Sequence, residues 1–229
     1  DYSQKFPEIQ FITISQTAQA FSNVWTIRYD PGFEPFLSGY AMAVTTYDWR
    51  SAGLIPNDIE HREETFLNGA QYFCGRCLSS VAPYITFPLI VSLPSSASPE
   101  AWESGIDQIQ SNYIYSYYIS PEAASEALFE KFKGMDATLI GANDQPEGLD
   151  GKWLATIRID LAGAILKIIS GEEMAAQPGE IVPDLLIIPG SVGKIFHSGK
   201  EGILQEVYRD LLSGLVSPYD PQPPASFEK

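Results

Sequence analysis

The stretch WLATIRIDLAGAILKII, residues 153–169, decides the predicted fold. Its first part, Trp153 to Asp160, and its last part, Ala164 to Ile169, are rich in the large and branched apolar side chains that favour strands. The short segment between them, Leu161 to Gly163, has the composition of a turn. We therefore predict two consecutive strands here, which a tight turn would pair in the antiparallel direction.

Strand patterns recur on both sides of this stretch. Residues Asn23 to Tyr29 alternate between their two faces, and the triplet Asp30-Pro31-Gly32 ends the pattern as a turn. Further strands are predicted at residues 6–17, 40–49, 86–93, 113–119, 137–140 and 185–188. Because the strands come in runs rather than in alternation with helices, we predict an α+β fold of mainly antiparallel β structure, sandwich or barrel-like.

About three amphipathic helices complete this prediction. Ser98-Pro99-Glu100 combines a hydroxyl N-cap, a proline in the first turn and an acid near the positive end of the helix dipole. The same opening recurs at Ser120-Pro121-Glu122, before a helix that Gly134 ends. A third helix is predicted from the apolar stripe between Ile203 and Leu215.

The chain is expected to form a single globular domain over residues 1–216, followed by a proline-rich tail over residues 217–229. The tail is expected to lie against its own domain or a neighbouring subunit. The apolar stretch Val81 to Pro94 is shorter than the ~20 residues that span a bilayer, so no transmembrane helix is predicted. The sequence begins at Asp1 without a methionine, which indicates a processed product, an excised segment or a trimmed chain. The sequence does not determine the localisation, for which we favour an extracytoplasmic or a processed chain.

The charge of the chain limits its partners. The 29 acidic and 14 basic residues give a formal net charge of -15, and the basic residues are not clustered. A surface of this kind repels phosphate backbones, so nucleic acid is excluded as a partner. Cationic partners, calcium, neutral sugars and other proteins, including a second copy of the chain, remain open.

The only motif with chemistry of its own is Cys74-Gly75-Arg76-Cys77. A C-x-x-C pair at a helix N-terminus beside a cation forms a reactive thiolate, which would make the chain a thiol-disulfide enzyme. The same cysteines with the only two histidines, His61 and His197, make a Cys2His2 set for zinc. The third interpretation is structural, either a disulfide or two buried thiols.

Three tyrosines suggest a binding surface. Tyr113, Tyr115 and Tyr117 lie on one face of the strand predicted at residues 113–119. Rings in a row suit a sugar or a protein partner if they are exposed, and they are ordinary core if a helix covers them. No catalytic constellation is evident, so we predict a non-enzymatic binding or assembly protein, structural in role, that uses this surface and the tail. The alternatives are an enzyme that uses Cys74 and Cys77, and a carbohydrate-binding module.

Overall fold

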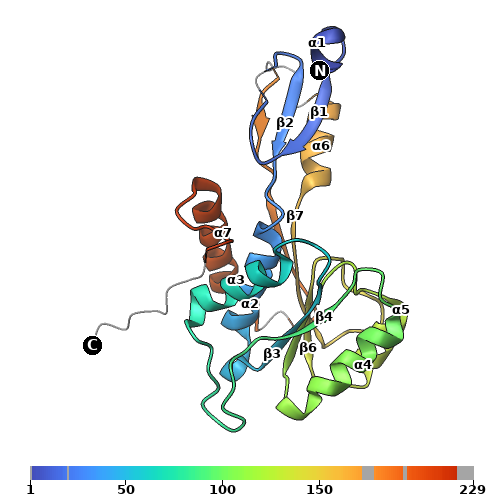
Figure 1. Cartoon of the computed structure of the whole chain (residues 1–229), viewed down its shortest axis with the longest axis vertical. Coiled ribbons are helices and arrows are strands. Elements are labelled where there is room, and N and C mark those ends of the chain that lie inside the picture. The colour runs from blue at the N-terminus through green and yellow to red at the C-terminus, as the bar shows by residue number, and fades with distance from the viewer. Residues whose placement is uncertain (1, 20, 172–177, 193–194, 221–229) are drawn as a thin grey trace, which may run out of the picture. The chain divides into compact units, whose positions relative to one another are not determined.

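The computed structural model describes residues 2–19, 21–171, 178–192 and 195–220 (Figure 1). The chain divides into two compact units. Unit 1 comprises Asp1–Pro31 and Ile159–Leu186, and unit 2 comprises Gly32–Arg158 and Ile187–Lys229. The backbone passes from one unit to the other three times, and each unit is described by itself below.

Unit 1 contains a small parallel sheet. Its strands are β1 (Phe11–Ser15), β2 (Val24–Arg28) and β8 (Glu180–Ile181), in the order β1-β2-β8. Helix α6 (Leu161–Ser170) places Ala164 and Ile168 against Trp25 and Ile27 of β2. The short helix α1 (Tyr2–Lys5) precedes β1. This unit therefore buries one sheet face beneath one amphipathic helix.

Unit 2 contains most of a larger sheet in the order β4-β3-β5-β6-β7-β9. The strands are β3 (Ser51–Pro56), β4 (Leu89–Leu93), β5 (Ser116–Ile119), β6 (Thr138–Gly141), β7 (Trp153–Ile159) and β9 (Leu185–Pro189); the last two cross the unit boundary. Strand β3 pairs in parallel with both β4 and β5, and β5-β6 and β6-β7 are also parallel. After β3 the chain adds β4 on one side and then β5 on the other, so the order reverses between β3 and β5.

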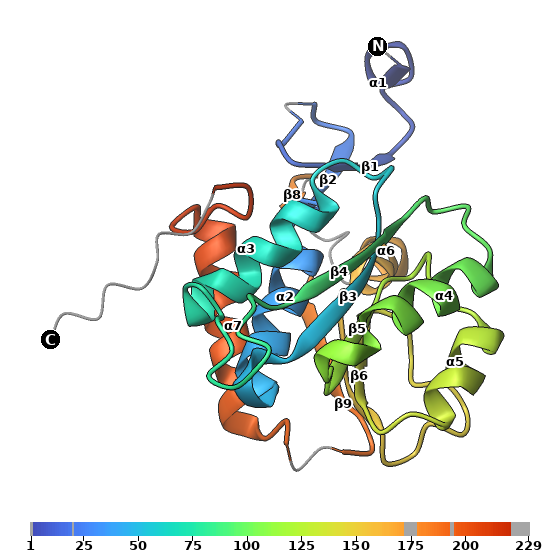
Figure 2. The same cartoon turned by 60° about the horizontal axis from the view of Figure 1, so that its bottom comes forward.

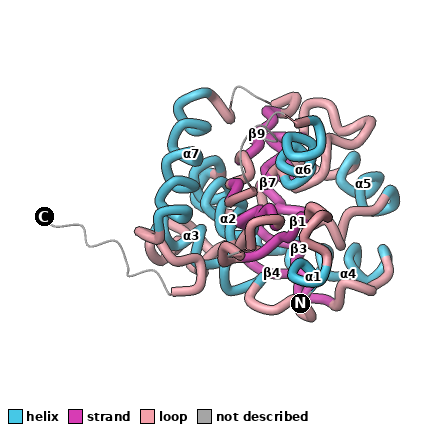
Figure 3. Tube along the Cα trace, turned by 90° about the horizontal axis from the view of Figure 1, so that it is seen from above, coloured by secondary structure: helices cyan, strands magenta, loops and turns pink. Residues whose placement is uncertain are grey.

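Helices cover both faces of this sheet. Helices α2 (Phe33–Thr45), α3 (Arg62–Cys74) and α7 (Ser198–Ser213) lie on one face. Helices α4 (Pro99–Ile109) and α5 (Glu126–Lys133) lie on the other, as Figures 2 and 3 show, and two short 3-10 turns span Tyr47–Trp49 and Gln110–Asn112. Successive side chains of β5 point to opposite faces of the sheet. Tyr117 packs against Phe132 of α5, whereas Tyr118 stacks on Phe66 of α3.

Helices α2 and α3 approach each other through two glycines. A Cβ atom built on Gly39 would lie 1.9 Å from the carbonyl oxygen of Phe66, and one built on Gly69 would lie 1.9 Å from that of Phe36. Such distances are far inside van der Waals contact, so each helix has a position that accepts no side chain. The two helices therefore fit only because both positions are glycine.

The predicted fold class is wrong. The structure is α/β with parallel-dominated sheets and seven α-helices among the described residues, not mainly antiparallel β with three helices. The decisive error is residues 161–170, which form α6 rather than a turn and a strand, with the Asp160 side chain accepting a hydrogen bond from the Gly163 backbone. The description of the chain as a β-rich structural protein is overturned with it.

Helix α2 was missed for a related reason, and α5 begins later than predicted. Residues 40–49 were predicted as a strand, but most of them belong to α2, which is buried on nearly every side and so shows no polar face. The helix predicted from Ser120 begins instead at Glu126, capped by Ser125. The N-cap predicted at Ser98 is confirmed, since its side chain accepts from the Ala101 backbone.

The beginning of the predicted tail packs on unit 2. The Asn68 side-chain amide donates to the Pro218 carbonyl oxygen at 3.0 Å, and the Tyr219 ring lies edge-on to His61 with centroids 5.3 Å apart. Residues 221–229 of the predicted tail lie outside the described residues. Among the described helices, none is long and apolar enough to cross a membrane.

Candidate functional site

A charged pair lies at the carboxyl edge of the unit 2 sheet, next to the point where the strand order reverses. Arg62 opens α3, a few residues after β3 ends at Pro56, and Glu122 follows β5. The Arg62 Nη2 and Glu122 Oε1 atoms are 3.4 Å apart. In open parallel sheets, ligands bind outside the carboxyl ends of the strands at such a reversal. The pair therefore stands where this class of sheet places its ligands.

The two side chains are largely buried, yet several of their polar atoms have no hydrogen-bond partner among the described residues. Their exposed fractions are 16% for Arg62 and 23% for Glu122. Nevertheless, Arg62 Nε, Arg62 Nη1 and Glu122 Oε2 are buried atoms that find no hydrogen-bond partner among the residues described. A buried polar atom without a partner costs about 1–3 kcal/mol, and more when it is charged. Three such atoms in one ion pair indicate hydrogen-bonding capacity that the protein itself does not use.

Tyr118 lies within electrostatic reach of the same pair. Burial raises the pKa of its hydroxyl far above the usual value, and the negative charge of Glu34, at the start of α2, raises it further. Arg62 opposes this rise in pKa, and Glu122 adds to it slightly. The hydroxyl is therefore neutral at physiological pH. We call Glu34, Arg62, Tyr118 and Glu122 the edge cluster.

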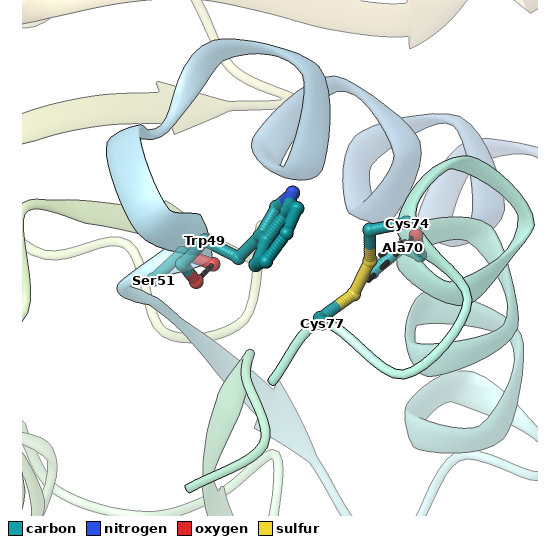
Figure 4. Close-up of a disulfide and its surroundings, with 5 residues drawn as sticks. All are labelled: Trp49, Ser51, Ala70, Cys74 and Cys77. Carbon is teal, nitrogen blue, oxygen red and sulfur yellow. Dashed lines mark hydrogen bonds between the residues drawn. A yellow bond between two sulfur atoms is a disulfide. The ribbon is translucent and has the colours of Figure 1, made fainter. Parts of the chain in front are cut away.

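The cysteines form a disulfide. Cys74 and Cys77 are bonded to each other, beside Trp49 and Ala70 (Figure 4). Cys74 is the last residue of α3, so it lies at the negative end of the helix dipole and not at the N-terminus that lowers a thiol's pKa. Cys77 is 1% exposed. This position suits a structural disulfide that holds the end of α3 to the following loop.

The histidines stand in separate roles. His61 precedes α3 and forms contacts with Glu60 and Glu64, while the His197 side chain accepts from the Gly199 backbone at the start of α7. Across the described ranges, no three His, Cys, Asp or Glu side chains gather in a way that could hold a metal ion. The structure thus does not bring the predicted Cys2His2 zinc set together.

The three tyrosines do not share one face. Tyr113 lies in the left-handed region at the end of a 3-10 turn and is 64% exposed, and Tyr115 in the loop that follows is 44% exposed. Tyr117 lies inside β5 and is buried against Phe132. Strand β5 begins only at Ser116, which is why the alternation predicted over residues 113–119 is interrupted.

A second charged pair is fully enclosed at the opposite, amino-terminal edge of the sheet. Arg50 and Asp48 have side chains 2% and 3% exposed, with Arg50 Nε 3.1 Å from Asp48 Oδ2. Arg50 also donates to the carbonyl oxygens of Val81 and Asn112 and to the Ser79 hydroxyl. Unlike the edge cluster, this pair meets its hydrogen-bonding needs internally, so it is a structural tie between loops.

We expect the Asp48 pair to make stability depend on acid. Hydrogen bonds from Ser79 and Ser80, with a smaller contribution from Arg50, hold the pKa of Asp48 well below its usual value. A depressed folded-state pKa contributes stability that is present above the unfolded pKa near 4 and is lost as the pH falls below it. Denaturant unfolding at pH 7, 5, 4 and 3 should show this loss, and Asp48→Asn should flatten it. An equal pH dependence in both proteins would contradict the assignment.

Arg62 and Glu122 were not singled out from the sequence. Arg62 falls in a segment, residues 57–67, that reads only as charged and ambiguous, and Glu122 was assigned to a helix start. The signal that could have found them is the position of each within a few residues of the carboxyl end of a buried parallel strand. That signal was hidden because β3, with the sequence SAGLIP, does not resemble a strand.

Several solved structures are similar to this chain, including the following two. One is the crystal structure of a transcriptional activator of the comK gene from Bacillus halodurans, with a TM-score of 0.64, 12% sequence identity, and coverage of 94% of this chain and 74% of that chain. The other is that of ABC transporter system solute-binding proteins from Aeropyrum pernix K1, with a TM-score of 0.59, 14% identity, and coverage of 94% and 72%. The likeness shows the fold alone. No protein-family model and no curated protein matches the sequence.

Proposed function

We propose that this chain is a non-enzymatic binding protein for a small polar solute, which the edge cluster holds at the carboxyl edge of the unit 2 sheet. The observation that carries the proposal is the set of buried, unpartnered atoms of Arg62 and Glu122 within the described chain. Their position at the strand reversal supports it. The similar structure from Aeropyrum pernix K1 is that of ABC transporter system solute-binding proteins, which agrees with the proposal.

The chemistry of the cluster favours a neutral, hydroxyl-rich solute. Arg62 offers only donors and the Glu122 carboxylate only acceptors, and the two lie side by side. Neighbouring hydroxyls of a sugar can accept from the guanidinium and donate to the carboxylate at the same time. Anions are disfavoured because Glu34 and Glu122 outnumber the one cation, and the chain as a whole carries -15. We therefore expect a monosaccharide or similar polyol.

We expect Arg62→Ala to abolish most of this binding. The probes are glucose, ribose and xylose, each titrated by calorimetry and tested for its effect on the melting temperature. A sugar at about 100 times its Kd should stabilise the wild type by about 2.7 kcal/mol. Loss of a charged hydrogen-bond donor should weaken binding by about 1.5–3 kcal/mol, which is about 10-fold to more than 100-fold.

Arg209→Ala is the matched control. Arg209 is also a helical arginine beside a glutamate, but its side chain is 71% exposed, so binding should not change. Glu122→Gln keeps the shape of the side chain and should weaken binding less than Arg62→Ala. The proposal fails if no probe stabilises the wild type, or if a bound sugar is held equally well after Arg62→Ala.

A further inference from the structure

Unit 2 exposes a set of apolar side chains at the amino-terminal edge of its sheet, away from the edge cluster. The six residues, with their exposed fractions, are Tyr47 (76%), Tyr84 (70%), Tyr113 (64%), Val81 (52%), Leu78 (49%) and Tyr115 (44%). They come from three segments, namely the turn after α2, the long loop between α3 and β4 (Figure 1), and the residues before β5. We call this set the tyrosine patch.

Contacts through Arg50 place these segments side by side. The Arg50 guanidinium donates to the carbonyl oxygens of Val81 and Asn112 and lies 6.0 Å from the centre of the Tyr113 ring. The Tyr47 and Tyr115 rings are 6.5 Å apart. One buried cation thus fastens three exposed aromatic segments together, so the patch is formed before any partner arrives.

The size of the patch suits a protein contact. At roughly 200 Å² per tyrosine, the exposed parts of the six side chains amount to on the order of 600 Å², which is at the upper end of what monomers expose. Two such patches facing each other would bury on the order of 1,200 Å², the low end for specific interfaces. Large aromatic residues are also those enriched in interfaces.

The charge of the patch indicates which protein could dock on it. The segments that carry it, residues 47–50, 76–87 and 110–116, contain a single acid, Asp48, and that acid is buried and paired with Arg50. The chain elsewhere holds the other acids, and two copies with net charge -15 repel one another over most orientations. Segments without exposed carboxylates form the surface on which two copies can meet with the least repulsion.

We propose that the tyrosine patch is a self-association surface, on which a second copy of this chain docks patch to patch. This surface is separate from the edge cluster and does not depend on the solute. Salt weakens the repulsion between the two acidic copies while leaving an aromatic contact intact. The dimer should therefore tighten as the salt concentration rises, the opposite of an interface held by charge pairs.

Sedimentation velocity of the full chain between 5 and 300 µM tests the proposal. We expect a reversible dimer, with a dissociation constant at least threefold lower in 0.5 M than in 0.05 M NaCl. Tyr47→Ser with Tyr84→Ser should raise that constant at least tenfold without shifting the thermal melt, because both side chains are mostly exposed. Leu215→Ser is the control, because Leu215 is an apolar residue of unit 2 that is 79% exposed but lies outside the patch, and this change should leave the dissociation constant unchanged.

Three results would overturn the proposal. A wild-type monomer at 300 µM in both salts would show that the patch does not self-associate. A dimer that the tyrosine variant leaves intact would place the interface elsewhere. A dimer that dissociates as salt rises would show an interface held by charge pairs, and the segments that carry this patch have no exposed carboxylate to form one.

Discussion

Gly39→Ala is expected to lower the free energy of unfolding by about 3 kcal/mol or more. The new Cβ would lie 1.9 Å from the Phe66 carbonyl oxygen, which is backbone and has no rotamer to change. Helices α2 and α3 would have to move apart, and the Phe66 ring that stacks on Tyr118 would move with them. Chemical denaturation followed by circular dichroism would measure the loss.

Gly202→Ala makes the control for this prediction. Gly202 lies in helix α7, and a Cβ there meets nothing within 4 Å. Because alanine is the better helix former, this change should stabilise the protein by about 0.5–1 kcal/mol. Identical substitutions in two helices would then act in opposite directions. A Gly39→Ala protein as stable as the wild type would mean that the helices are not in this close contact.

Arg50→Met is expected to cost about 3–5 kcal/mol, because it leaves the Asp48 carboxylate buried without its cation. The change also removes the donors to the carbonyl oxygens of Val81 and Asn112, so the loops that carry the tyrosine patch lose their common anchor. Urea unfolding at pH 7 measures the cost. Protease cleavage within residues 78–86 should become faster at the same time.

Two further variants separate charge from packing at this position. Arg158→Met breaks an ion pair of similar length, Arg158 to Asp144 at 2.8 Å, but at the surface, where we expect a loss below about 1 kcal/mol. Adding Asp48→Asn to Arg50→Met removes the stranded charge and should recover part of the stability, since asparagine tolerates the positive φ of this position. If the added Asp48→Asn change destabilises the protein further, the loss of stability in Arg50→Met comes from packing alone.

Local signals in the sequence located many of the elements but not the fold class. The N-cap at Ser98, the apolar stripe of α7 and strands β2, β6 and β7 were placed from cap chemistry and periodicity. Helices α2 and α6 failed because each is rich in apolar residues on several sides, which periodicity does not distinguish from a buried strand. Because these two helices were not predicted, the alternation of strands and helices that is typical of a parallel sheet was not recognised.

The candidate site followed the same division. The Cys74-Cys77 motif was recognisable because the two cysteines are close in sequence. In contrast, Arg62 and Glu122 are far apart in sequence and come into contact only because strands β3 and β5 are neighbours in the sheet. Sixty residues separate the two members of this pair along the chain. Such a site can be predicted only when the parallel pairing of the strands is known. The sequence had indicated antiparallel pairing, so the site was not predicted.

The order of strands in unit 1 also constrains how the protein is made. Strand β2 pairs on one side with β1, which is close in sequence, and on the other with β8, which is synthesised ~150 residues later. At ribosomal rates of about 5–20 residues per second, the first two strands are exposed for roughly 8–30 s with one backbone edge unpaired. Strands β3 to β7 of the larger sheet emerge during that interval, so we expect the small sheet of unit 1, although it begins the chain, to be completed after most of the larger sheet has formed.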